Sequence, residues 1–124
     1  MRIAGGFAAA LIGMAIAGCA TPVALRTAPA PVDGCDAAMY GGVLVASAWS
    51  GLAVQGLGGG REVVEVLWPF GYSATRDRSG KATLRDGSGD EIAQEGETIT
   101  MGGGRDGDGA WIACAGTVAN APGI

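Results

Sequence analysis

The sequence predicts an all-β fold, a small antiparallel barrel of about five to six strands. From about Cys35 onward, short runs rich in β-branched residues follow one another at a spacing of about ten residues, with glycines between them. No run in this part of the chain has helical periodicity over ten or more residues. The 24 glycines among 124 residues can supply the turns and corners of a small barrel.

The elements are expected in the following order. Strands are predicted at 43–49 with a continuation at 52–54, then at 62–68, 81–85, 91–94, 98–101 and 110–114. Turns are predicted at 56–60, 86–89 and 95–97, and a long loop at 102–109. Because the rest of the interior consists of small residues, Trp49, Trp68 and Trp111 are expected to fill the core. No internal repeat is visible.

The beginning of the chain has the pattern of a secretory signal peptide. One basic residue, Arg2, precedes an uncharged apolar stretch at 3–18. An uncleaved transmembrane anchor is the alternative, but four glycines dilute this stretch and Pro22 follows it. The stretch ends at Ile16, Ala17, Gly18 and Cys19, which resembles the bacterial lipoprotein signal motif: an aliphatic residue and two small residues before a cysteine.

This resemblance implies cleavage between Gly18 and Cys19 after the Cys19 thiol has received a diacylglyceryl group. The mature chain would then have 106 residues and a net charge of −5, because Arg2 would be removed. Its acyl chains would anchor it to a membrane on the extracytoplasmic side of the bacterial cell envelope. In a host with two membranes, Ala20 after the cysteine implies the periplasmic face of the outer membrane.

The mature chain divides into three parts on composition. Residues 19–32 contain three prolines and little charge, which predicts a lipidated N-terminus followed by a flexible linker. Residues 33–118 are expected to form the barrel domain, and residues 119–124 a flexible tail.

Cys35 and Cys114 remain once Cys19 is lipidated. An even pair in an exported chain favours a disulfide, which would close a loop of roughly 80 residues and stabilise the fold by about 4.5 kcal/mol in the chain-entropy model. A reactive thiol is the alternative, but it needs a neighbouring cation or helix N-terminus, and the sequence offers little of that kind.

A second resemblance supports the barrel. Residues 68–72 (WPFGY) and 84–104 (LRDGSGDEIAQEGETITMGGG) resemble a pattern of small exported bacterial domains with an OB-like barrel and uncharacterised function. The chain departs from that pattern at Glu97, at Asp90 and Glu91, and at Gly51, where such domains often have a cysteine. The resemblance implies a fold and no activity.

Composition excludes several functions. Without histidine the chain cannot build a Ser-His-Asp or Cys-His pair or a histidine-ligated metal site. Its acidic charge disfavours nucleic acid as a partner. The glycine runs lack the residues that make a nucleotide fingerprint, and no cofactor is expected. Asp86, Ser88, Asp90 and Glu97 have partial calcium-loop spacing, but Glu91 stands where that loop needs glycine, so a hairpin is favoured and no metal site is predicted.

Two further groups of side chains could carry a function. Trp68, Phe70 and Tyr72 alternate, so in an extended chain they would share one face and could form a ligand platform, although a place in the core is favoured. Acidic pairs that could do acid–base chemistry are Glu62/Glu65, Asp90/Glu91, Glu95/Glu97 and Asp106/Asp108, all expected to face solvent.

The sequence therefore predicts a membrane-anchored envelope lipoprotein with no catalytic residues. It is expected to be a non-enzymatic module that binds an envelope protein, a cell-wall component or a small ligand. The alternatives are a carboxylate-dependent envelope hydrolase and a purely structural lipoprotein.

Overall fold

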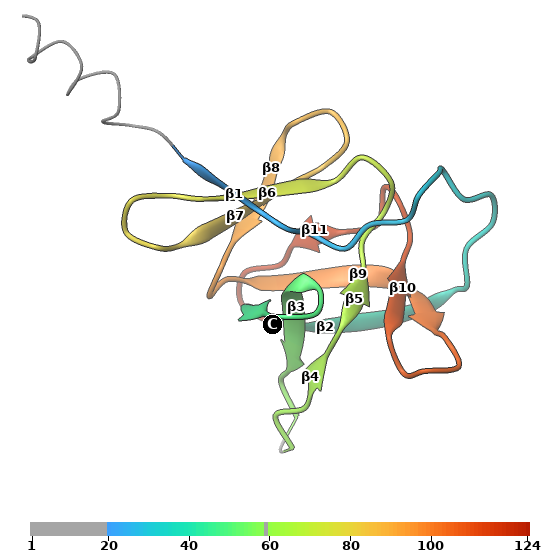
Figure 1. Ribbon diagram of the computed structural model, residues 1–124. Helices are drawn as coiled ribbons and strands as arrows, with labels where there is room; N and C mark the ends of the chain where they lie inside the picture. The colour runs from blue at the N-terminus through green and yellow to red at the C-terminus, as the bar shows by residue number, and fades with distance from the viewer. Residues whose placement is uncertain (1–19, 59) are drawn as a thin grey trace, which may run out of the picture.

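The computed structural model describes residues 20–58 and 60–124, and within them it confirms the all-β class (Figure 1). Among these residues no helix has the length and apolar character to cross a bilayer. The strands are β1 (Thr21–Val23), β2 (Ala38–Ser47), β3 (Gly51–Gly56), β4 (Val63–Val64), β5 (Val66–Leu67), β6 (Ser73–Arg76), β7 (Ala82–Arg85), β8 (Glu91–Gln94), β9 (Thr98–Arg105), β10 (Trp111–Ala113) and β11 (Ala119–Asn120).

A nearly closed six-strand barrel forms the larger part of the fold. Its strands lie in the order β4-β3-β2-β9-β10-β5, and β11 adds to β9. Only Glu65 separates β4 from β5, so one continuous segment forms both edges of this sheet: it pairs with β3 at its start and with β10 at its end. This segment closes the barrel.

The prediction of purely antiparallel pairing is wrong for one pair, β5 and β10. These strands are parallel, with Val66 opposite Trp111. Four antiparallel steps lead from β4 through β3, β2 and β9 to β10. After an even number of reversals β10 runs in the direction of β4, and therefore also in the direction of β5, which continues it. Closure by one segment thus requires a parallel pair.

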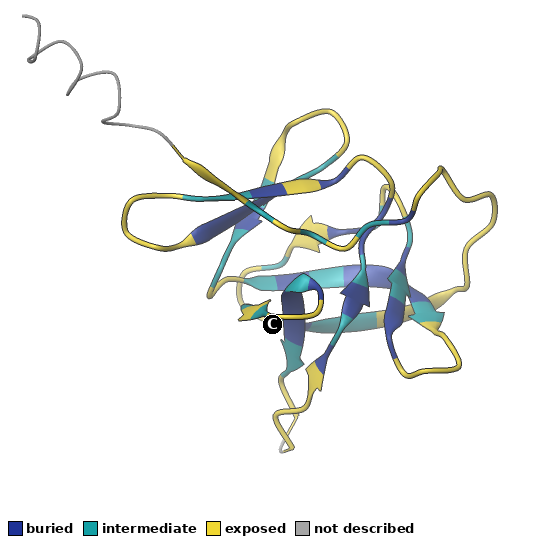
Figure 2. Ribbon diagram, in the orientation of Figure 1, coloured by how far each residue is buried: buried dark blue, intermediate teal, exposed yellow. Residues whose placement is uncertain are grey.

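Most of the largest fully buried side chains come from the barrel strands and Trp68, and Figure 2 shows the buried stretches of these strands in dark blue. Trp68 is fully buried, and its indole N–H donates to the Leu52 carbonyl at 2.9 Å. Trp111 is also buried. The prediction that Trp49 fills the core is wrong: it is 45% exposed in the turn after β2, and the Arg26 guanidinium lies 4.1 Å from its ring centroid.

A second, four-strand antiparallel sheet has the order β1-β6-β7-β8. Its first strand corrects the predicted linker at 19–32, because Thr21 pairs with Arg76 and Val23 with Ala74. The chain then hydrogen-bonds to the barrel up to Ala28, whose amide donates to the Trp68 carbonyl at 2.8 Å. Pro22 is tolerated because β1 is an edge strand and has a partner on one side only.

The predicted loop at 102–109 is also partly wrong, since β9 continues to Arg105. Its glycines are needed because β10 and the turn after it approach closely. A Cβ on Gly103 would lie 2.0 Å from the Ile112 carbonyl oxygen, and one on Gly102 would lie 3.1 Å from Thr117 Oγ1. These glycines therefore let neighbouring segments pack against β9, although a run of glycines in a sequence is typical of a loop.

The predicted flexible tail at 119–124 begins with a strand. In β11, Ala119 pairs with Thr100 and Asn120 with Ile99 of β9. The Asn120 side-chain amide also donates to the Glu97 carboxylate at 3.2 Å. The chain is thus held to the barrel as far as Ala121, whose amide donates to the Thr98 carbonyl at 2.9 Å.

One six-residue turn occurs three times, at 76–81, 85–90 and 105–110. The prediction of no internal repeat is therefore wrong, because these turns share the sequence Arg-Asp-x-Ser/Asp-Gly-x. In each turn the aspartate carboxylate accepts from the amides two and four residues later. In each, the arginine donates to the carbonyl of the glycine, which has a φ of about +90°. Only glycine adopts this conformation without strain.

Candidate functional site

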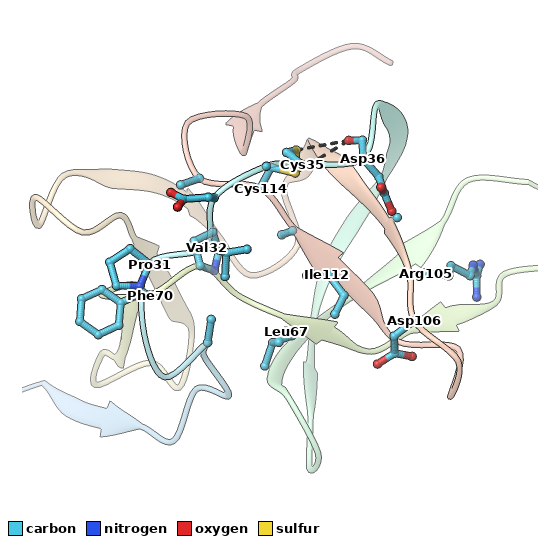
Figure 3. Close-up of a pocket in the computed structure, with 17 residues that line it drawn as sticks. Pro31, Val32, Cys35, Asp36, Leu67, Phe70, Arg105, Asp106, Ile112 and Cys114 are labelled. Atoms are coloured by element: carbon cyan, nitrogen blue, oxygen red, sulfur yellow. Dashed lines mark hydrogen bonds between the residues drawn. A yellow bond between two sulfur atoms is a disulfide. The ribbon is translucent and has the colours of Figure 1, made fainter.

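A groove of about 800 Å³ opens between three segments of the chain (Figure 3). One wall is the irregular segment 28–36. A second is 67–70, from the end of β5 onward, and the third is the end of β9 together with β10 and the residues after it. The volume lies in the range of about 300–1,000 Å³ that is usual for ligand sites.

The floor and one rim of the groove are apolar. Ala28 and Ala113 are buried, and Leu67 and Ile112 are half-buried. At the rim, Val32 is 67% exposed and Phe70 is 51% exposed. Large apolar side chains that line a concave surface and stay exposed are typical of a binding site.

The Cys35–Cys114 disulfide joins two walls of this groove. The bond is present, with the two Cα atoms 5.8 Å apart, and it links segment 28–36 to the end of β10. The cross-link therefore fixes an otherwise strand-free wall against the barrel.

The charges on the groove are mostly negative. Three carboxylates line it, from Asp33, Asp36 and Asp106, against one cation, Arg105. The Arg105 guanidinium is already engaged, because it forms a 3.5 Å ion pair with Glu62 and lies 5.8 Å from the Tyr40 ring centroid. The groove therefore favours a ligand with apolar groups and positive charge.

The three aromatic residues at 68–72 do not share one face. Trp68 and Tyr72 are buried, and only Phe70 is exposed, at the rim of the groove. The reason is local: Phe70 and Gly71 form a turn, with the Tyr72 amide donating to the Pro69 carbonyl at 3.1 Å. The extended conformation on which the platform depends is absent at these residues.

The residues of the lipoprotein motif, Ile16, Ala17, Gly18 and Cys19, lie outside the described residues. The first strand of the structure, β1, begins at Thr21, two positions after Cys19.

The calcium-loop spacing belongs to two separate turns. The Asp86 carboxylate accepts from the amides of Ser88 and Asp90 within its own turn, and the Glu97 carboxylate accepts from the Gln94 amide. Among the described residues no group of three acidic or cysteine side chains could hold a metal ion.

The acidic pairs lie on different turns and strands. Glu95 pairs with Arg76 at 3.2 Å, and Asp106 accepts from amides in its own turn. Glu65 and Glu95 are half-buried, and Glu65 lies at the point where β4 passes into β5. Its carboxylate accepts from the hydroxyls of Ser47 at 2.5 Å and Ser50 at 2.6 Å.

These contacts set the protonation of Glu65. Burial acts to raise the pKa of its carboxyl, but the hydrogen bonds from Ser47 and Ser50 outweigh it, so the pKa lies below its usual value. The Ser50 hydroxyl is fully buried and also accepts from the Val66 amide at 2.9 Å. Glu65 and the two serines therefore fasten the turn after β2 to the segment that closes the barrel.

Comparison of the chain with protein-family models, curated proteins and solved structures finds no match.

Sequence reasoning missed the groove because its walls come from three distant segments. One signal was present: the apolar run Ala28–Val32, with prolines at 29 and 31, precedes Cys35 and has no charge. In the structure, residues of this run line one wall of the groove.

Proposed function

We propose that the protein is a lipid-anchored envelope module without catalytic activity, which binds an extended, positively charged apolar peptide segment of a partner protein. The anchor rests on the resemblance of Ile16–Cys19 to the lipoprotein signal motif. The binding role rests on the groove, and this is the observation that carries it: an apolar floor, an acidic rim and a cross-linked wall.

The choice of partner follows from the chemistry of the lining. Leu67, Ile112 and Phe70 offer apolar contacts to side chains, and the carboxylates of Asp33 and Asp36 offer partners to lysine or arginine. Attraction between exposed charges weakens with salt, so binding to this rim should fall as ionic strength rises.

The anchor is tested by mass spectrometry of the mature protein from a bacterial host. The expected product begins at Cys19 and carries acyl chains, and a Cys19→Ala chain should retain its first 18 residues. A wild-type chain that still begins at Met1 would overturn the anchor.

The groove is tested with two synthetic peptides that share leucine, valine and phenylalanine and carry either lysines or glutamates between them. The lysine peptide should shift the amide NMR signals of Ile112 and Ala113, and the glutamate peptide should not.

Phe70→Asp should weaken this binding. Leu57→Asp is the matched control, because Leu57 is 50% exposed, close to the 51% of Phe70, and does not line the groove. Equal binding of both peptides would remove the role of the acidic rim, and no shift with either would overturn the binding site.

A further inference from the structure

The three repeated turns differ in charge although their backbone hydrogen bonds are the same. The turns at 85–90 and 105–110 each carry one arginine and two carboxylates. The turn at 76–81, which joins β6 to β7 and is called the basic hairpin below, carries Arg76, Arg78 and Lys81 against Asp77 alone. Although the protein has a net negative charge, three of its eight basic residues lie in this one turn.

Two of these cations are exposed and face solvent. Arg76 forms an ion pair with Glu95 at 3.2 Å, and the Asp77 carboxylate accepts from the amides of Ser79 and Lys81. Arg78 and Lys81 are exposed, and within the described part of the chain neither forms an ion pair.

The basic hairpin also lies where the chain enters the domain. Thr21 of β1 is the register partner of Arg76, the last residue of β6 before the turn. Two residues of extended chain span at most about 7 Å, and paired strands lie about 5 Å apart. The start of β1 therefore lies beside this hairpin, and a lipid on Cys19, two positions before Thr21, would be within reach of it.

We propose that the basic hairpin lies on the anionic phospholipid headgroups of the membrane to which Cys19 is anchored, with Arg78 and Lys81 making the contact. This inference rests on the proposed lipid anchor and adds an orientation to it. Lys and Arg side chains near an anionic membrane surface are attracted to it, so these cations beside an acyl anchor would hold the domain in one orientation.

The orientation has a consequence for the groove. Segment 28–36 lies at the opposite side of the molecule from the basic hairpin (Figure 1). With the hairpin on the headgroups, the groove faces away from the membrane and is open to a partner.

The test uses the full chain with its native acyl groups, reconstituted into phosphatidylcholine vesicles with or without phosphatidylglycerol. A fluorophore is attached at Ser79→Cys or, as control, at Ser88→Cys, which occupies the same position in the matching turn. Because Cys35 and Cys114 form a disulfide and Cys19 would be acylated, the new cysteine is the free thiol. Quenching by headgroup-labelled lipid is measured.

Quenching at position 79 should exceed that at position 88, should require phosphatidylglycerol, and should be lost in high salt. The double substitution Arg78→Gly, Lys81→Asp gives the basic hairpin the sequence of residues 85–90, which already forms this turn, so the fold is kept. It should abolish the difference between the two positions.

Two results would overturn the inference, and they are distinguishable. Equal quenching at both positions in chains that float with the vesicles would remove the hairpin contact and leave the anchor standing. A chain that does not float with the vesicles would remove the anchor, and the orientation with it.

Discussion

The barrel and the four-strand sheet are held together in different ways. The barrel contributes large buried side chains such as Trp68, Leu44 and Ile99, is closed by one continuous segment, and is cross-linked at β10. The sheet β1-β6-β7-β8 contributes mainly alanines and one leucine to the core, and two copies of the repeated turn join its strands. Stability in the barrel should therefore depend on packing and closure, and in the sheet on turn geometry.

The largest effect is expected in the barrel core. Trp68→Ala removes a fully buried indole and the hydrogen bond to Leu52, and should lower the free energy of unfolding by about 3–5 kcal/mol. Urea denaturation measures it. Phe70→Ala, close by but half-exposed, should cost no more than about 1 kcal/mol. Similar losses for both would contradict the placement of Trp68.

The disulfide comes next. Cys35→Ser with Cys114→Ser should lower the free energy of unfolding by about 2–5 kcal/mol, because the bond closes a long loop. Chemical reduction of the wild type should give the same loss. In the variant, the backbone amides of β10 should exchange faster with solvent. Faster exchange in β7 alone would contradict the view that the disulfide stabilises the barrel and not the four-strand sheet.

The Glu65 contact gives a smaller effect that depends on pH. Ser50→Ala leaves the Val66 amide without its partner and should cost about 1–3 kcal/mol. Since the pKa of Glu65 is lowered in the folded state, the stabilisation is complete above pH 4.5 and is lost as the pH falls through the folded pKa.

Glu65→Gln is the control for this pH dependence. Because glutamine does not titrate, this variant should lose less stability at low pH than the wild type. The pKa of Asp77 is also lowered, by bonds from Ser79 and the Lys81 amide, so some sensitivity stays in the variant. If thermal melts from pH 3 to 6 changed equally in both chains, Glu65 would have no part in it.

The smallest effect belongs to the turns of the sheet. Gly80 and Gly89 have φ angles of 91° and 88° in equivalent positions, so alanine at either should cost about 1 kcal/mol. The two losses should agree within error in thermal melts. A clear difference would show that the turns are not energetically equivalent despite their matching hydrogen bonds.

Sequence patterns predicted the barrel where side chains determine the strand. Val43–Ser47 and Leu52–Val54 lie within β2 and β3, and the cysteine pair is bonded as expected. The prediction failed where a strand depends on backbone pairing and close approach and not on its side chains. Pro22 hid β1, because proline is acceptable only at an edge that a single sequence does not reveal. Gly102–Gly104 looked like a loop, because the residues that require their small size, Asp36, Ile112 and Thr117, are distant in the sequence.

The candidate site was less accessible to sequence reasoning. Phe70 was singled out, but with Trp68 and Tyr72, which a turn at Gly71 directs into the core. The groove needs residues 28–36, 67–70 and 104–115 together, and this depends on β5 pairing with β10. The repeated turn was readable in the sequence, since Arg-Asp and Gly recur at fixed spacing, and recognising it would have shown how unusual the charges at 76–81 are.

The closing segment of the barrel also sets an order for folding. Its first half pairs with β3, which is near in sequence, whereas its second half must wait for β10, close to the end of the chain. Contacts between distant residues form slowly, because the intervening chain must first lose its freedom. We expect the hairpin of β2 and β3 to form early with β4 attached, and the barrel to shut only when Trp111 arrives beside Val66.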